Sequence, residues 1–168
     1  FVDSLLNAMV RLRNEVFSIN SGDIRLKYRI LEPFVLEIYE DNNKKIPIPL
    51  LSSGYSQIIP IDIMSRTGKF MIIEEPELNL HAGAQVSIAN YLSGLTQGKK
   101  LFLTTHSDIF TIQMAINHVR GNKNKVLKIY LLNEGKMEEI RYTEKGDVEE
   151  IPTISDVIRK QINEIYGE

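Results

Sequence analysis

The chain has 168 residues, of which 43% are hydrophobic and 25% are charged, the composition of an ordinary globular domain. A formal net charge of -2 gives no general attraction to polyanions, and the absence of cysteine excludes disulfides and thiol chemistry. No apolar run approaches the length of a membrane span, so we expect a soluble, cytoplasmic protein with a single domain at residues 1–168.

The front of the chain carries apolar residues at helical spacing. From Val2 onward the pattern predicts an amphipathic helix that runs to about Ser18 and ends in a polar turn, so that residues 1–20 form one helical segment. Because Phe1 already lies within this pattern and is not a methionine, we expect the segment to be the returning end of an upstream insertion.

The rest of the chain alternates between strand-like and helix-like patterns. Period-two alternation predicts two strands between residues 24 and 40, on either side of Glu32-Pro33. The other predicted elements are, in chain order, an extended segment at 46–51, a helix at 55–66 that Pro60 kinks or interrupts, a buried strand at 70–73, a helix at 83–95, a buried strand at 101–105, a helix capped by Ser107 or Asp108, a hairpin at 125–143 and an amphipathic helix at 154–165.

Two adjacent carboxylates, Glu74 and Glu75, follow the apolar strand that begins at Phe70. On these residues alone, solvated surface carboxylates and a metal-binding and water-activating pair are equally good interpretations. About thirty residues separate Glu75 from His106, the size of one strand-helix-strand crossover between parallel strands. Because parallel strands end at one edge, where ligands bind, we expect Glu74, Glu75 and His106 to converge there.

Four motifs follow one another in a characteristic order over roughly residues 50–110. They are LSSGYSQ at 51–57, FMIIEEPE at 70–77, NLH at 79–81 and LFLTTHS at 101–107. This order resembles the second half of an ABC-type ATPase head, above all the soluble AAA-type ATPases of the structural-maintenance-of-chromosomes, recombination-protein and overcoming-lysogenisation-defect group. The resemblance implies an α/β P-loop NTPase fold, with a parallel central sheet flanked by helices and antiparallel hairpin additions.

The resemblance also implies roles for individual residues. Glu74 matches the Walker B acid that holds Mg²⁺, although aspartate is more usual there; Glu75 matches the catalytic base, and His106 the switch histidine at the γ-phosphate. The residues that match nucleotide-contacting segments are Ser52, Ser53, Gly54 and Gln57 of the signature motif and Asn79 and Leu80 of the D-loop. His81 departs from the family pattern, because Ala82 rather than proline follows it, and we assign it to a loop or a helix start.

A phosphate-binding P-loop of the form GxxxxGK[ST] is missing from the sequence. Gly68-Lys69 and Gly98-Lys99 lack the required spacing, and each fits a turn glycine followed by a solvated lysine. We therefore expect ATP and Mg²⁺ to bind only together with an N-terminal P-loop half of the same protein, and this chain alone to be inactive. The resemblance further implies a homodimer of heads that does not associate with a membrane. Such a dimer would serve DNA maintenance, DNA repair or defence, and would contact DNA through the complete protein.

Two other functions stay open. The first is a non-catalytic regulatory or docking module that keeps the ATPase fold. The second is a metal-dependent hydrolase with four candidate ligands, namely Glu74, Glu77, His81 and His106. A basic stretch could also touch nucleic acid, but a solvated loop rim is the better interpretation of its members, Arg120, Lys123, Lys125 and Lys128.

Overall fold

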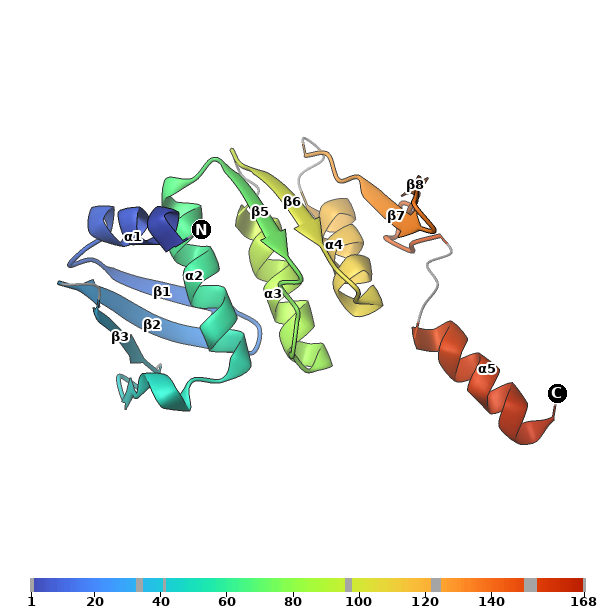
Figure 1. The fold of residues 1–168 in the computed structure, drawn as a ribbon, viewed down its shortest axis with the longest axis horizontal. Coiled ribbons are helices and arrows are strands. Elements are labelled where there is room, and N and C mark those ends of the chain that lie inside the picture. The colour runs from blue at the N-terminus through green and yellow to red at the C-terminus, as the bar shows by residue number, and fades with distance from the viewer. Residues whose placement is uncertain are drawn as a thin grey trace. The chain divides into compact units, whose positions relative to one another are not determined.

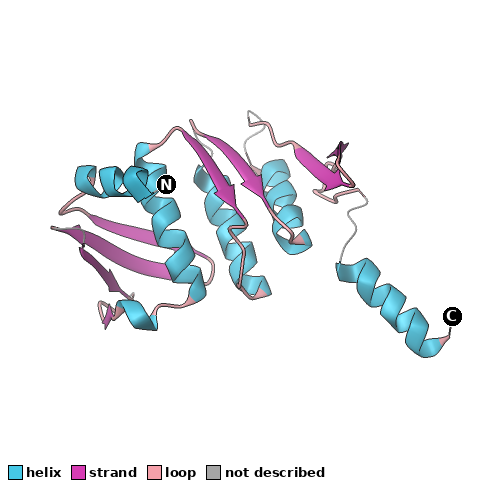
Figure 2. Ribbon diagram, viewed as in Figure 1, coloured by secondary structure: helices cyan, strands magenta, loops and turns pink. Residues whose placement is uncertain are grey.

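The computed structural model describes residues 2–32, 35–40, 42–95, 98–121, 125–149 and 154–167 (Figure 1). The chain divides into two compact units, Phe1–His106 and Ser107–Glu168. Both units contain helices and strands, as Figure 2 shows. The predicted α/β class is confirmed, whereas the single domain at residues 1–168 stays a prediction.

The first unit begins with a helix and a four-stranded antiparallel sheet. These elements are α1 Val2–Arg11, β1 Val16–Ser21, β2 Ile24–Leu31, β3 Val35–Tyr39 and β4 Lys45–Ile46, followed by a 3₁₀ helix, η1 Ile48–Leu50. Every second residue of β2 is buried, as the alternation predicted, and Tyr28 is fully buried among them. The predicted break at Glu32-Pro33 lies partly outside the described residues.

The opening helix is shorter than predicted, so the expected helical segment at residues 1–20 is wrong. α1 ends at Arg11, and Asn14 has a left-handed backbone with φ of 63° while its amide donates to the carbonyl of Ile30 at 2.8 Å. The following residues form β1, where Phe17 and Ile19 are buried and their neighbours are exposed. A short apolar run fits both the helical and the strand period, and pairing with β2 decides between them.

Helix α2, Ser53–Thr67, packs between the sheet and helix α3, Ala82–Leu95 (Figure 1). Pro60 lies inside α2 and does not interrupt it, so the predicted interruption is wrong and the predicted kink stays a prediction. A proline in a helix interior costs about 3 kcal/mol. Burial of apolar side chains on two sides of α2 offsets this cost. These side chains include Ile58, Ile59 and Ile63.

Strands β5, Phe70–Glu74, and β6, Lys100–Thr104, form the predicted parallel pair with α3 as their crossover. The register pairs Glu74 with Thr104, so both strands end at the same edge. Met71 is buried on one face of the pair, while the opposite face is exposed.

The second unit contains the remaining predicted elements. They are α4 Asp108–Arg120, the hairpin of β7 Ile129–Asn133 and β8 Lys136–Ile140, and α5 Ile154–Tyr166. Ser107 caps α4, as predicted, by accepting a hydrogen bond from the amide of Phe110 at 3.1 Å. Across the described ranges, none of the helices has the length and apolar character to cross a membrane.

Candidate functional site

The carboxyl ends of β5 and β6 bring a glutamate and a histidine together. Glu74 ends β5, and the amide of Glu75 donates to the carbonyl of Thr104 at 2.9 Å, which extends the ladder by one hydrogen bond. Glu75 then enters the left-handed region with φ of 43°. Its Oε1 lies 3.5 Å from Nε2 of His106. Three predicted site residues, Glu74, Glu75 and His106, therefore lie at this edge.

The edge is open to solvent. The side chain of His106 is 89% exposed and that of Glu75 is 37% exposed, and Glu74 is also exposed. Carboxylate oxygens are the ligands that Mg²⁺ prefers, and a carboxylate can accept a proton from an attacking water. The donor atoms at this edge thus fit a magnesium-bound phosphate with a water beside it.

The loop after Glu75 consists of two successive turns. The amide of Leu78 donates to the carbonyl of Glu75 at 3.0 Å, and the amide of Leu80 donates to the carbonyl of Glu77 at 3.1 Å. Asn79 lies in the second turn with φ of 60°. Both predicted D-loop residues, Asn79 and Leu80, therefore lie in the turns that lead from Glu75 toward α3.

Glu77 is the buried acid of this loop, with 5% of its surface exposed. Its Oε1 accepts hydrogen bonds from the hydroxyl of Thr105 at 2.5 Å and from the amide of His106 at 3.1 Å. Its Oε2 is buried without a hydrogen-bond partner among the described residues. Sequence reasoning placed Glu77 only in the metal-ligand alternative. A charged residue in the short loop between β5 and α3 is the signal that could have found this contact.

The predicted signature motif lies at the start of α2. Ser52 is the N-cap, and its Oγ accepts from the amide of Tyr55 at 3.4 Å, while Ser53 is exposed. Gly54 is buried, and a Cβ at this position would lie 3.7 Å from Cδ2 of Leu80. The amino end of a helix favours anions because its amides and its dipole face them.

Gln57 links the start of α2 to the loop that follows β5. Its Nε2 donates to the carbonyl of Leu78 at 2.6 Å, and its Oε1 is buried without a partner in the described part of the chain. The amide nitrogen of Gln57 is thus already used inside the chain, and the nucleotide contact predicted for this residue stays a prediction.

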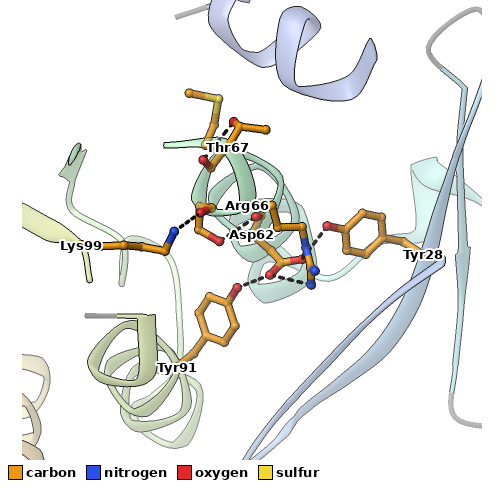
Figure 3. Close-up of polar contacts among 8 residues, drawn as sticks. Tyr28, Asp62, Arg66, Thr67, Tyr91 and Lys99 are labelled. Atoms are coloured by element: carbon orange, nitrogen blue, oxygen red, sulfur yellow. Dashed lines mark hydrogen bonds and ion pairs between the residues drawn. The ribbon is translucent and has the colours of Figure 1, made fainter. Parts of the chain in front are cut away.

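A buried polar cluster lies around Asp62 in the middle of α2 (Figure 3). Asp62 is 3% exposed and lies between Tyr28 of β2 and Tyr91 of α3. Its carboxylate accepts hydrogen bonds from the hydroxyl of Tyr28 at 2.5 Å, from the hydroxyl of Tyr91, and from Nε and Nη2 of Arg66 at 2.8 and 3.2 Å. The guanidinium of Arg66 also stacks 4.1 Å from the ring centre of Phe17.

Burial and the negative charge of Asp62 together raise the pKa of Tyr28 and of Tyr91 well above the ordinary value. The cluster therefore joins the sheet, α2 and α3 through one carboxylate. Sequence reasoning missed it. The available signal was a single acid between isoleucines, with an arginine four residues later.

His81 lies directly before α3, which agrees with its predicted place in a loop or at a helix start. Its Nδ1 accepts from the amide of Ala84 at 3.3 Å. Within the described ranges, no group of three or more His, Asp or Glu side chains is placed to hold a metal ion. The four candidate ligands of the metal-dependent hydrolase are all described, so the geometry contradicts that alternative. Glu77 and His81 are instead bound to backbone amides.

Two lysines predicted to be solvated have specific partners. Nζ of Lys99 donates to the carbonyls of Ser65 at 2.5 Å and Gly68 at 3.1 Å, so this cation caps the carboxyl end of α2 (Figure 3). In the basic stretch, Lys128 pairs with Glu139 at 3.4 Å. Lys123 lies outside the described residues.

The model of the family described as "AAA domain, putative AbiEii toxin, Type IV TA system" matches residues 5–112. No curated protein matches the chain. Similar solved structures include a chain from work on ATP-driven dimerisation and DNA-stimulated activation of SMC ATPases, with 13% identity over 96% of this chain and 89% of that chain and a TM-score of 0.48. The SMC head domain from Thermotoga maritima has 11% identity over 84% of this chain and 46% of its own, with a TM-score of 0.47.

A third is the Smc head domain of Pyrococcus furiosus with an extended coiled coil, bound to the C-terminal domain of ScpA. It shows 14% identity over 98% of this chain and 37% of its own, with a TM-score of 0.44. The chain thus spans less than half of the last two structures.

The family match covers more than half of the chain, and it contains the predicted signature motif, the carboxylates at the end of β5 and His106. An AAA domain is a nucleotide-binding ATPase module, which agrees with the general class that the motif order predicted. The chain therefore belongs to the AAA-domain family whose description names the AbiEii toxin of type IV toxin–antitoxin systems.

Proposed function

We propose that the chain forms the C-terminal lobe of an ABC-type ATPase head that binds and hydrolyses ATP. The observation that carries this proposal is the 3.5 Å approach of Glu75 Oε1 to His106 Nε2 at the carboxyl edge of a parallel strand pair. Ligands of open α/β sheets bind at this edge. The AAA-domain match over the same residues supports a nucleotide as the ligand.

In this proposal each residue of the edge has one task. Glu74 holds Mg²⁺, Glu75 accepts a proton from the attacking water, and His106 donates a hydrogen bond to the terminal phosphate. When bound, Mg-ATP supplies the transferable phosphoryl group and the metal charge that offsets its oxygens. The partial exposure of Glu75 supports its task, because a water can reach its carboxylate.

We further propose that a P-loop half of the same protein covers the exposed face of β5 and β6. Parallel strands are normally covered on both faces. Large apolar side chains of this face stay 58% to 64% exposed, namely Phe70, Ile72 and Phe102. A lobe that buries them and brings a phosphate-binding loop to the Glu74 edge would complete the site.

The second part of the site comes from another copy of the complete protein. Two heads pair with two-fold symmetry, so that the signature motif of one subunit reaches the nucleotide of the other. Ser53 supports this arrangement, because it lies exposed in the first turn of α2, beside amides suited to a phosphate. We place the dimer in the cytoplasm, in DNA maintenance, DNA repair or defence, with DNA contact through the complete protein.

A mixing experiment with the complete protein tests the shared site. Glu75→Gln removes the base from both sites of a dimer, and Ser53→Arg blocks both signature motifs, so each variant alone should be inactive. Mixed dimers contain one site with an intact Glu75 and an intact Ser53, and an equal mixture should recover roughly a quarter of the wild-type turnover. Glu138→Ala, at an exposed position in β8, is the control that keeps full activity.

The possible outcomes separate the parts of this proposal. Lack of recovery on mixing would contradict the shared site while leaving hydrolysis intact. Lack of turnover by the wild-type protein, with an intact P-loop present, would instead favour the non-catalytic docking module.

A further inference from the structure

One carboxylate oxygen joins the two loops that carry the site. Oε1 of Glu77 accepts from the hydroxyl of Thr105 at 2.5 Å and from the amide of His106 at 3.1 Å. Glu77 belongs to the loop that follows β5 and carries Glu75, whereas both donors belong to the two residues that follow β6. The contact therefore links the loop that carries Glu75 to the segment that carries His106.

Strand pairing ends before these loops begin. The hydrogen bond from the Glu75 amide to the Thr104 carbonyl is the last one of the parallel ladder among the described residues. Hydrogen bonds to an ionised acceptor are roughly twice as strong as neutral ones, and burial strengthens them further. Glu77, at 5% exposure, meets the condition of burial.

Packing against other side chains does not fix the position of the His106 side chain. It is 89% exposed, so the place of its imidazole depends on where its backbone is held. The His106 amide is held by Glu77, and the imidazole then lies 3.5 Å from Glu75. A shift of the loop after β6 would move the histidine away from the base.

We propose that Glu77 is a positioning residue for ATP hydrolysis, which acts through the backbone of His106 to keep the imidazole beside Glu75. The inference rests on the ATPase function proposed above. Glu77 uses only one oxygen in this contact, because Oε2 has no partner in the described part of the chain. A glutamine can present its amide oxygen to the same two donors, whereas an alanine cannot.

The kinetic test compares Glu77→Ala with Glu77→Gln in the complete protein. Displacement of a reacting group by about 1 Å can cost on the order of a hundredfold, so we expect kcat of Glu77→Ala to fall roughly tenfold to a hundredfold with KM nearly unchanged. Glu77→Gln should stay within about threefold of the wild type, because it keeps the acceptor. Wild-type kcat in Glu77→Ala would overturn the proposal, and so would a Glu77→Gln variant as slow as Glu77→Ala.

Thr105→Val extends the test if Glu77→Ala does not fold. It removes one of the two donors and should lower kcat by about threefold, since the hydrogen bond from the His106 amide remains. An unchanged kcat in this variant would count against the proposal.

Amide hydrogen exchange gives a readout that does not depend on catalysis. The amide of His106 should be protected in the wild type and in Glu77→Gln, and should exchange rapidly in Glu77→Ala. The amide of Leu80 is the internal control, because it donates to the backbone carbonyl of Glu77 and not to the side chain. If the wild-type protein lacks turnover, the proposed function fails and exchange still tests the contact. Unchanged protection of His106 in Glu77→Ala would overturn the inference.

Discussion

The Asp62 cluster and the Glu75 edge are both built on a carboxylate, yet they use its lone pairs in opposite ways. Asp62 is 3% exposed and accepts hydrogen bonds from two tyrosines and an arginine. Glu75 is 37% exposed, and its 3.5 Å contact with His106 is longer than a good hydrogen bond. A buried acid with several donors stabilises the fold, whereas an acid that keeps lone pairs open can serve a ligand.

The two regions should therefore respond differently to substitution. Replacement of a carboxylate at the Glu75 edge by the amide of the same size should alter turnover and leave the free energy of unfolding nearly unchanged. Changes in the Asp62 cluster should lower that free energy and affect turnover only through the fraction of folded protein.

The largest expected effect is that of Glu75→Gln on hydrolysis. Loss of a general base costs about a hundredfold to ten-thousandfold in rate. Because the residue is partly exposed, the free energy of unfolding should change by less than about 0.5 kcal/mol. Steady-state turnover of the complete protein and urea denaturation measure the two quantities. A variant that loses stability along with activity would break the proposed contrast.

Asp62→Ala should have the next largest effect, this time on stability. The change leaves two buried tyrosine hydroxyls and the partly buried Arg66 without their shared acceptor, which should cost about 3 kcal/mol. Urea denaturation of this chain measures the loss, with Asp62→Asn as the size-matched comparison. A loss below about 1 kcal/mol would show that the cluster does not stabilise the fold.

Alkaline pH should weaken the same cluster without a mutation. The pKa values of Tyr28 and Tyr91 are raised from the ordinary 10.0, by burial first and by Asp62 second, so the folded state holds these protons more tightly than the unfolded state. This stability is fully present below pH 10 and is lost as the pH rises above that value. Denaturation midpoints should stay level between pH 8 and 10 and fall above pH 10, and Tyr91→Phe should make the fall shallower. An equal slope in Tyr91→Phe would contradict the assignment.

The smallest effect is expected at Glu37, a surface acid between the two extremes. Hydrogen bonds from Lys45, Arg29 and Tyr39 lower the pKa of Glu37 from 4.5 to about 2. Its stabilising contribution is present above pH 4.5 and is lost as the pH falls toward 2. Glu37→Gln should flatten this part of the stability curve slightly, because its cationic partners, Arg29 and Lys45, are 41% and 58% exposed and solvent screens the two ion pairs. A large change in the free energy of unfolding at acid pH would show that Glu37 stabilises the fold as strongly as the Asp62 cluster does.

The Glu75 edge could be predicted from sequence because its signals are local. A short apolar run that ends in charges predicts a strand and its carboxyl end, and a crossover of suitable length predicts the parallel partner. The resulting approach of Glu75 and His106 is what the structure shows. The prediction of one helix over residues 1–20 was wrong because its signal was only local. A short apolar run fits both the helical and the strand period, and the pairing of β1 with β2 distinguishes them.

The Asp62 cluster and the Glu77 contact could not be predicted, because their partners are distant in sequence. Tyr28 and Tyr91 lie 34 and 29 residues from Asp62, and Thr105 lies 28 residues from Glu77. A lone acid in an apolar helix indicates that a partner exists but not which residue it is. Only the packing of α2 against the sheet and α3 identifies the partners.

The left-handed backbone of Glu75 has a consequence for evolution and for protein engineering. A φ of 43° is unfavourable for a residue with a Cβ, by about 1 kcal/mol, and costs glycine almost nothing. Glu75→Gly should therefore make the protein more heat-resistant while removing its proposed base, so that selection for thermal tolerance and selection for activity oppose each other at one residue. A library screened only for survival on heating should lose the acid at position 75 early.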